Sequence, residues 1–280
     1  MGNILYHYCS VDAFYNILKN ATIWLSDVSK SNDYQECVLC RDRVNAAIEK
    51  IMSENEEDLE AWKWGIAHGS ELNREIYTYC ACFSESCDQL SQWRGYANNG
   101  KGMAIGFDKD LLQELAEVDK RGISFAPILY DRDKQDEYVK EIVEDNIRKL
   151  EFKGIGHVGV ELNTNYRLKF PFLKNSSFWE EKEWRIVVCS RPGANQKKVT
   201  YNFQFSEVRY RVLDEKLISY IEMDFSKIKK ELIKEIWIGP KSEVEISDVE
   251  NFLYTCGYYE GVAHNTDEPI LIEKSSSSYR

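Results

Sequence analysis

Short strand-like segments and amphipathic helices alternate irregularly along this chain of 280 residues, and this irregular order is the feature that most limits the possible folds. A parallel sheet is built from a regular strand–helix–strand repeat, and no such repeat is present. Expected strands lie at 4–9, 22–26, 77–84, 102–107, 123–130, 184–189, 199–205, 207–213, 217–223, 235–238 and 269–273, and expected helices at 36–76, 89–97, 109–118, 134–152 and 246–256. The sequence therefore predicts an α+β fold with a mostly antiparallel sheet.

Capping residues mark the start of two helical segments. Ser10 or Asp12 is expected to cap a helix that ends near Lys19, and Asp88 is expected to cap the helix at 89–97. Ser and Asp side chains favour such positions because their oxygens accept hydrogen bonds from the free N–H groups of the first turn.

Length and composition predict one domain. A single core can serve up to about 250–300 residues, and no linker rich in Pro, Gly or Ser divides this chain. The hydrophobic fraction of 43% is enough for a real core. We expect a single α+β domain over residues 1–280, with helical insertions near 41–76 and 134–176 and a frayed tail near 275–280.

The charge and hydropathy patterns exclude several function classes. The net charge of −11 opposes nucleic-acid binding over a broad surface, because phosphates are neutralised by a basic face. The sequence has no apolar run of about 18 residues, and its start lacks the basic and apolar regions of a signal peptide. These features predict a cytoplasmic protein with no membrane partner.

The cysteines are interpreted as reduced thiols that pack in the core rather than as a zinc site. No His stands beside any of the closely spaced cysteines, and free Cys is among the most buried residue types. We therefore expect no metal site. The eight cysteines are Cys9, Cys37, Cys40, Cys80, Cys82, Cys87, Cys189 and Cys256.

Two titratable groups belong to expected strands. His7 should share one strand face with Leu5 and Cys9, as either a hydrogen-bonded core imidazole or a ligand-contacting group at the mouth of a cleft. Glu183 opens a strand and should point to the same face as Arg185. That pair is either an exposed ion pair or part of a pocket beside the neighbouring tryptophans.

Two more clusters have both a structural and a functional interpretation. Ser84 ends a strand, and Trp93 and Tyr96 follow on the next helix, which either docks on the sheet or contributes to a binding pocket. The segment 29–33, which contains Asn32, is either a solvated turn or a ligand-binding loop.

Several of these motifs together resemble the bacterial domain-of-unknown-function 2971 family. The opening motif is Tyr6-His7-Tyr8, a helix that ends at 17–20, then Trp24-Leu25-Ser26-Asp27 and Asn32-Asp33. The middle and closing motifs are Cys82-Phe83-Ser84-Glu85, Trp93, Tyr96, Gly100-x-Gly102, Ile105-Gly106-Phe107, Trp179-x-x-Lys182-Glu183-Trp184-Arg185 and Ile238-Gly239-Pro240. The resemblance covers about residues 4–240.

That family in turn is similar to ADP-ribosyltransferases of the His-Tyr-Glu type. The similarity rests on the strand His, on the Ser29-Lys30-Ser31-Asn32-Asp33-Tyr34 stretch and on Glu183-Trp184. It implies an ADP-ribosyltransferase-like split antiparallel sheet with helical insertions. It also implies a transferase that uses NAD as a substrate and passes ADP-ribose to a macromolecule or to water, as bacterial toxins and antiviral defence effectors do.

The resemblance assigns roles to individual residues. His7 and Glu183 would be catalytic, with His7 orienting the ribose and Glu183 stabilising the oxocarbenium-like transition state as nicotinamide leaves. The Tyr that stacks on nicotinamide in that type would fall near Ile23 or Trp24 and is missing, so Trp24, Trp93 or Tyr96 would replace it. The expected NAD-binding residues are Tyr8, Ser26, Asn32, Ser84, Trp93, Tyr96 and Arg185.

Two other functions remain open at this stage. An inactive transferase-like module would bind a nucleotide or a partner protein in a defence system, and the missing Tyr favours it. A metal-dependent nucleic-acid-processing enzyme would use Glu36, Glu85 and Glu183, and the net charge opposes it.

Overall fold

The computed structural model describes residues 3–30, 76–115, 122–149, 167–190, 202–213, 215–259 and 269–279, together with scattered residues within 43–53 and 160–165. Asn32, Glu36, Cys37 and Cys40, and most of the helix expected at 36–76, lie outside the described residues. None of the described helices has the length and apolar character that a membrane crossing requires.

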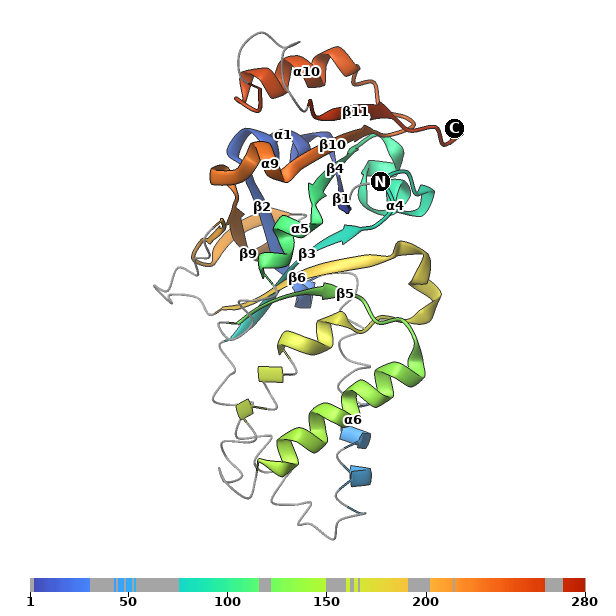
Figure 1. The fold of residues 1–280 in the computed structure, drawn as a ribbon, viewed down its shortest axis with the longest axis vertical. Coiled ribbons are helices and arrows are strands. Elements are labelled where there is room, and N and C mark those ends of the chain that lie inside the picture. Colours follow the sequence, from blue (N-terminus) through green and yellow to red (C-terminus); the bar gives the residue numbers. More distant parts are fainter. Residues whose placement is uncertain are drawn as a thin grey trace.

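One large, mostly antiparallel sheet organises the described part of the chain (Figure 1). Its strands are β1 (Ile4–Cys9), β2 (Thr22–Asp27), β3 (Tyr77–Ser84), β4 (Met103–Asp108), β5 (Ile123–Pro127), β6 (Glu183–Ser190), β7 (Gln204–Phe205), β8 (Arg209–Leu213), β9 (Lys216–Asp224), β10 (Ile233–Ile238) and β11 (Leu271–Lys274). The order is β11-β10-β4-β1-β3-β2-β9-β7, with β6 between β3 and β5, and β8 beside β9. Among these strand pairs only β10 and β11 run parallel. The expected α+β class with a mostly antiparallel sheet is confirmed.

The sheet divides at β3. β6 pairs with β3 from Tyr77 to Ser84, so β1 and β2 share the opposite edge of β3. β1 meets that edge only at Ser84, and β2 meets it only at Tyr79 and Cys80. Among the described strands, none lies beside the edge of β3 between these points, and β1 and β2 diverge there.

Helices cover the sheet in two groups. The helices are α1 (Val11–Asn20), α4 (Leu90–Tyr96), α5 (Lys109–Gln113), α6 (Arg132–Arg148), α9 (Lys229–Leu232) and α10 (Ile246–Thr255). In Figure 1, α1, α9 and α10 gather around β10 at the top of the view, and α6 lies below β5. The main core joins Leu5, Leu18, Phe107, Ile236 and Leu253 from these elements, so the helices around β10 and the sheet bury one apolar cluster.

The structure corrects several expectations. Ser10 caps α1 by accepting a hydrogen bond from the Ala13 N–H, as expected, but Asp88 does not cap α4; Gln89 occupies that position without a side-chain bond. The insertion expected near 134–176 ends in short 3₁₀ helices at Phe170–Phe172 and Ser176–Glu181.

The tail expected to fray is held against the end of α4. The Ser275 and Ser277 hydroxyls donate to Asp88 at 2.5 and 3.2 Å. The Tyr279 hydroxyl donates to Asn99 Oδ1 at 2.5 Å. Residues 275–279 therefore lie against the molecule, because a carboxylate and an amide that are distant in sequence supply their acceptors.

Candidate functional site

His7 fills the gap at which β1 leaves β3. Its Nδ1 lies 2.9 Å from the Cys82 carbonyl oxygen, which only accepts, so Nδ1 carries the proton and donates. Burial lowers the pKa of His7, which favours the neutral ring. Nε2 is then an acceptor, and it forms no hydrogen bond with any described residue.

Glu183 is placed by a sharp turn between a 3₁₀ helix and β6. Lys182 adopts a left-handed conformation, with φ of 44°, and Glu183 then pairs with Ser84 as β6 begins. The Glu183 carboxylate accepts from Arg185 Nε at 2.6 Å and from Lys174 Nζ at 3.1 Å. Glu183 and Arg185 thus share one strand face, as the sequence predicts, but both are buried rather than exposed.

Lys174 joins a second carboxylate to this group. Its ammonium lies 2.8 Å from Glu181 Oε2, and the Tyr96 hydroxyl donates to Glu181 Oε1 at 3.5 Å. Lys174, Glu181, Glu183 and Arg185, hereafter the charge cluster, carry two positive and two negative charges. Buried charges are tolerated when they are paired and hydrogen-bonded in this way.

The charge cluster keeps the Glu183 carboxylate ionised. Burial alone would raise the pKa of Glu183, but the Arg185 guanidinium and the Lys174 ammonium overcome this effect and lower the pKa below its ordinary value. The backbone N–H of Glu183 donates to the Tyr130 hydroxyl at 2.9 Å, and burial raises the pKa of that phenol. The site therefore presents a neutral imidazole and an ionised carboxylate.

The imidazole and the carboxylate line one cavity. The cavity has a volume of about 50 Å³. Small-molecule sites usually have about 300 Å³ or more, and one water needs about 10–15 Å³, so this cavity has room for a few waters only. It is lined by Tyr6, His7, Tyr8, Cys82, Phe83, Gln92, Tyr96, Glu181 and Glu183.

The structure brings most of the expected site residues together. His7, Tyr8, Tyr96 and Glu183 line the cavity. Ser84 and Arg185 stand directly behind it, where the Ser84 hydroxyl donates to the Glu181 carbonyl at 2.7 Å and Arg185 bonds to Glu183.

Two expected site residues lie elsewhere. Trp93 is fully buried, packs edge-on against Tyr8 with the ring centres 4.7 Å apart, and donates to Asp88 at 2.6 Å. Ser26 lies on β2, where its hydroxyl accepts from Arg211 at 3.2 Å. Asn32, the remaining one, lies outside the described residues.

Sequence reasoning missed Lys174 and Glu181. Glu181 stands two positions before Glu183, so its signal was present, but only the left-handed Lys182 turns both carboxylates toward one cavity. Lys174 had no usable signal, because it reaches the cluster from the segment between two 3₁₀ helices.

Of the glutamates of the metal-dependent alternative, Glu85 and Glu183 do not meet, and Glu36 lies outside the described residues. Glu85 accepts from the Trp184 indole at 2.9 Å, and Trp184 and Glu183 point to opposite faces of β6. Within the described residues, no three His, Cys, Asp or Glu side chains form a group that could hold a metal ion.

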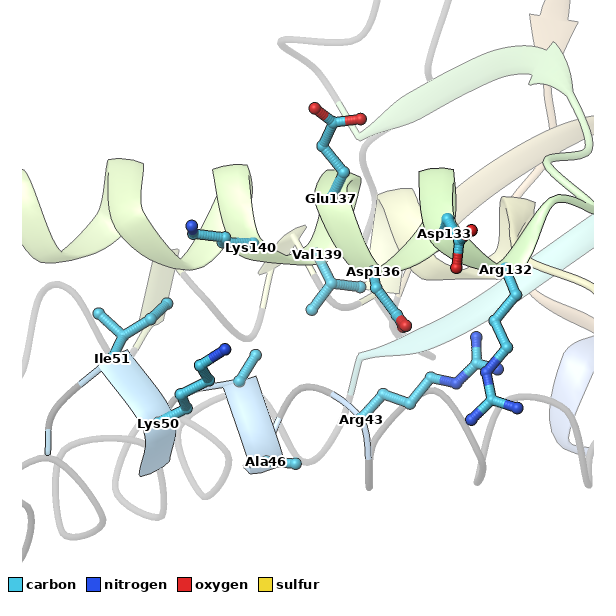
Figure 2. A pocket seen from close by; sticks show the side chains of 11 residues that line it. Arg43, Ala46, Lys50, Ile51, Arg132, Asp133, Asp136, Glu137, Val139 and Lys140 are labelled. Atoms are coloured by element: carbon cyan, nitrogen blue, oxygen red, sulfur yellow. The ribbon is translucent and has the colours of Figure 1, made fainter. Parts of the chain in front are cut away.

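A larger cavity lies away from these residues, between α6 and the scattered described residues of 43–51 (Figure 2). Its volume is about 660 Å³. Four cations and three carboxylates line it, and none of the expected site residues does. The charged lining residues are Arg43, Lys50, Arg132, Lys140, Asp133, Asp136 and Glu137.

Comparison with known proteins gives one match. A family model described as "Protein of unknown function (DUF2971)" matches residues 92–186, from α4 to β6. The chain is similar to that family over this segment, which contains Tyr96 and the charge cluster but not His7. No curated protein and no solved structure matches the chain. The match supports the domain-of-unknown-function resemblance within 92–186 and says nothing of ADP-ribosyltransferases.

Proposed function

We propose that the protein is an NAD-dependent, ADP-ribosyltransferase-like enzyme. The observation that supports this most is that His7 and Glu183, which are far apart in the sequence, line the same cavity at the split of an antiparallel sheet. The resemblance, which rests on motifs alone, assigned these two residues to one site. The geometry is compatible with that assignment.

The proposed reaction breaks the bond between nicotinamide and the ribose C1′ atom. Nicotinamide leaves with the bonding electron pair, and an acceptor hydroxyl, amine or water forms the new bond to C1′ and loses its proton. Nε2 of His7 would accept a hydrogen bond from a ribose hydroxyl. The ionised Glu183 carboxylate would stabilise the positive charge that develops on the ribose.

The reaction requires the cavity to widen, because about 50 Å³ does not admit a dinucleotide. Tyr96 is the lining residue that we expect to move, since it is 45% exposed and the other lining residues are buried or half-buried. Tyr96 and Tyr8 are also the aromatic lining groups available to stack on nicotinamide.

The biological role belongs to the same proposal and rests on the resemblance alone. The acceptor would be a protein, a nucleic acid or water, and the enzyme would act in the cytoplasm as a toxin or an antiviral defence effector.

A second candidate is a binding module with no catalysis. It is favoured because the Glu183 carboxylate already accepts hydrogen bonds from Arg185 and Lys174 in a small cavity. Such a module would hold a nucleotide, or a partner protein of a defence system, without cleaving a bond.

Free nicotinamide and bound NAD, measured on the pure full-length protein, test the proposal. We expect NAD to bind and nicotinamide to be released. Glu183→Gln should abolish release while retaining binding, and Glu180→Gln, on an exposed neighbouring carboxylate, should leave both unchanged. NAD binding without release in the wild type would select the binding module. The absence of both would refute the enzyme proposal.

A further inference from the structure

An aromatic and cationic platform lies on the face of the sheet where β2, β8 and β9 run side by side. The Trp24 and Tyr220 rings have centres 4.4 Å apart, with 32° between their planes. The Arg211 guanidinium lies over Trp24 at 5.2 Å from the ring centre. These three residues, hereafter the Trp24 platform, join neighbouring strands because Ser26 pairs with Tyr220 and Arg211 pairs with Ile218.

Trp24 is partly exposed to solvent. It is 38% exposed, whereas Tyr220 beneath it is 8% exposed. The ring contacts of Trp24 with described residues are those to Tyr220 and Arg211. A partly exposed indole that contacts a second ring and a guanidinium is a surface on which another planar group can stack.

Arg211 has N–H groups that form no hydrogen bond with the described residues. One of its terminal nitrogens donates to Ser26 at 3.2 Å, but Nε is buried without a hydrogen-bond partner, and the other terminal nitrogen forms no hydrogen bond with the described residues. The carboxylate of Glu222, on the same face, is already paired with Arg209 at 2.6 Å. Arg211 therefore keeps a positive charge that no described carboxylate neutralises.

The platform is separate from the cavity of His7 and Glu183. Ser26 pairs with Cys80 of β3, and Glu183 pairs with Ser84 of the same strand. Those two positions on β3 are four residues apart, which corresponds to about 13 Å along a strand. None of the three platform residues lines the cavity.

We propose that the Trp24 platform binds a nucleotide, with the base stacked on Trp24 and the phosphate bound by Arg211. A nucleotide carries a planar π system and an anion a few ångströms apart, and the platform offers an aromatic face and an uncompensated guanidinium at a matching spacing. The ligand is either a free nucleotide or one unit of a single strand. This inference goes beyond the proposed NAD reaction and does not depend on it.

Titrations of the full-length protein with AMP, adenosine and a short oligoadenylate test the proposal, with binding followed by calorimetry. Trp24→Ala should weaken the binding of AMP and adenosine by about tenfold to a hundredfold, because both ligands stack. Arg211→Gln should weaken AMP about tenfold, to the affinity of adenosine, and leave adenosine unchanged, because only AMP carries the phosphate. If oligoadenylate binds through Trp24 and Arg211 and AMP does not bind, the proposal is supported and the ligand is one unit of a single-stranded nucleic acid.

Matched control variants test whether AMP binds at the Trp24 platform or elsewhere on the protein. Trp179→Ala removes an indole that is 64% exposed, and Arg148→Gln removes an exposed guanidinium on α6; both should bind AMP like the wild type. Trp24→Phe keeps a stacking ring and should lose less affinity than Trp24→Ala, so the comparison holds even if the alanine variant unfolds. The proposal is wrong if neither ligand binds, or if binding survives Trp24→Phe and Arg211→Gln unchanged. It is also wrong if Glu183→Gln abolishes AMP binding, because the nucleotide then occupies the cavity.

Discussion

The imidazole of His7 is connected to the sheet through one nitrogen and lines the cavity where the sheet splits. Its Nδ1 donates to the Cys82 carbonyl, so the protonation state of the ring is tied to the packing of β1 on β3. A charged ring would have to be accommodated where burial already opposes charge. This makes His7 a source of pH-dependent stability.

The wild-type protein should lose stability as the pH falls from 7.5 to 5. Above the ordinary His pKa of 6.5 the ring is neutral in both the folded and the unfolded protein. Below it the unfolded chain binds a proton that the folded protein, with its lowered pKa, does not, and stability falls by up to about 1.4 kcal/mol per pH unit. His7→Gln keeps a donor for Cys82 but cannot titrate. Urea unfolding of both proteins at several pH values should show a shallower slope for His7→Gln, and equal slopes would contradict the lowered pKa.

Lys174 should matter more for stability than any exposed lysine. Lys174→Met would remove the buried ammonium that the carboxylates of Glu181 and Glu183 share, a loss of about 3–5 kcal/mol. Lys140→Met breaks only an exposed ion pair with Glu144 on α6 and should cost about 1 kcal/mol or less. Urea unfolding at pH 7 measures both changes. A cost for Lys174→Met no larger than that for Lys140→Met would mean that the charge cluster is open to water.

At the level of whole elements, local sequence patterns predicted the bounds of several strands. β1, β3 and β6 begin and end within about one residue of their expected positions, because alternating apolar residues and end signals mark them. The parallel pairing of β11 with β10 and the contact of Ser26 with Arg211 depend on partners far along the chain. Trp24 shows the difference. Its strand was expected, but the register of β2 against β9 places its ring on Tyr220 instead of in the cavity.

The C-terminal segment is the clearest case of an element fixed by distant partners. Asp88 accepts from the Trp93 indole and from three serine hydroxyls of the tail. Burial opposes its charge, but the hydrogen bonds from Ser275 and Trp93 prevail and lower the pKa of Asp88. A cluster of serines looks disordered in a sequence because its acceptor lies elsewhere.

Asp88→Ala should release the tail. With the shared acceptor gone, backbone amides of residues 275–279 should exchange with deuterium at least about tenfold faster, because their local opening loses hydrogen bonds worth about 1 kcal/mol or more each. Exchange in β3 should stay unchanged. Asp136→Ala, on an exposed position of α6, is the matched control and should leave the tail protected. Hydrogen exchange followed by mass spectrometry reads each segment separately.

At the scale of the whole molecule, three segments that are distant in the sequence meet at Gly102. The Gly102 N–H donates to the Ala97 carbonyl at 2.8 Å, and its own carbonyl accepts from the Gly239 N–H at 2.9 Å. The end of α4, the start of β4 and the end of β10 therefore meet at this point. The Gly100-x-Gly102 and Ile238-Gly239-Pro240 motifs, which are distant in the sequence, are two sides of one junction.

Gly102→Ala should destabilise the entire protein, because the junction has no room for a side chain. A Cβ atom there would lie 2.1 Å from the Cys9 carbonyl oxygen and 3.0 Å from the Ala97 backbone, and both neighbours are main chain that cannot rotate away. Relieving that overlap means separating β4 from the end of β1, so we expect a loss of about 3 kcal/mol and a single, cooperative unfolding transition at lower temperature. Gly95→Ala is the matched control, since a Cβ on that residue of α4 meets no heavy atom within 4 Å and alanine favours a helix. Calorimetry of the two variants should show a lower melting temperature for Gly102→Ala and an equal or higher one for Gly95→Ala. If Gly102→Ala melted like the wild type, β1, β4 and β10 would not be packed as closely as this junction requires, and the position of His7 beside β3 would lose its support.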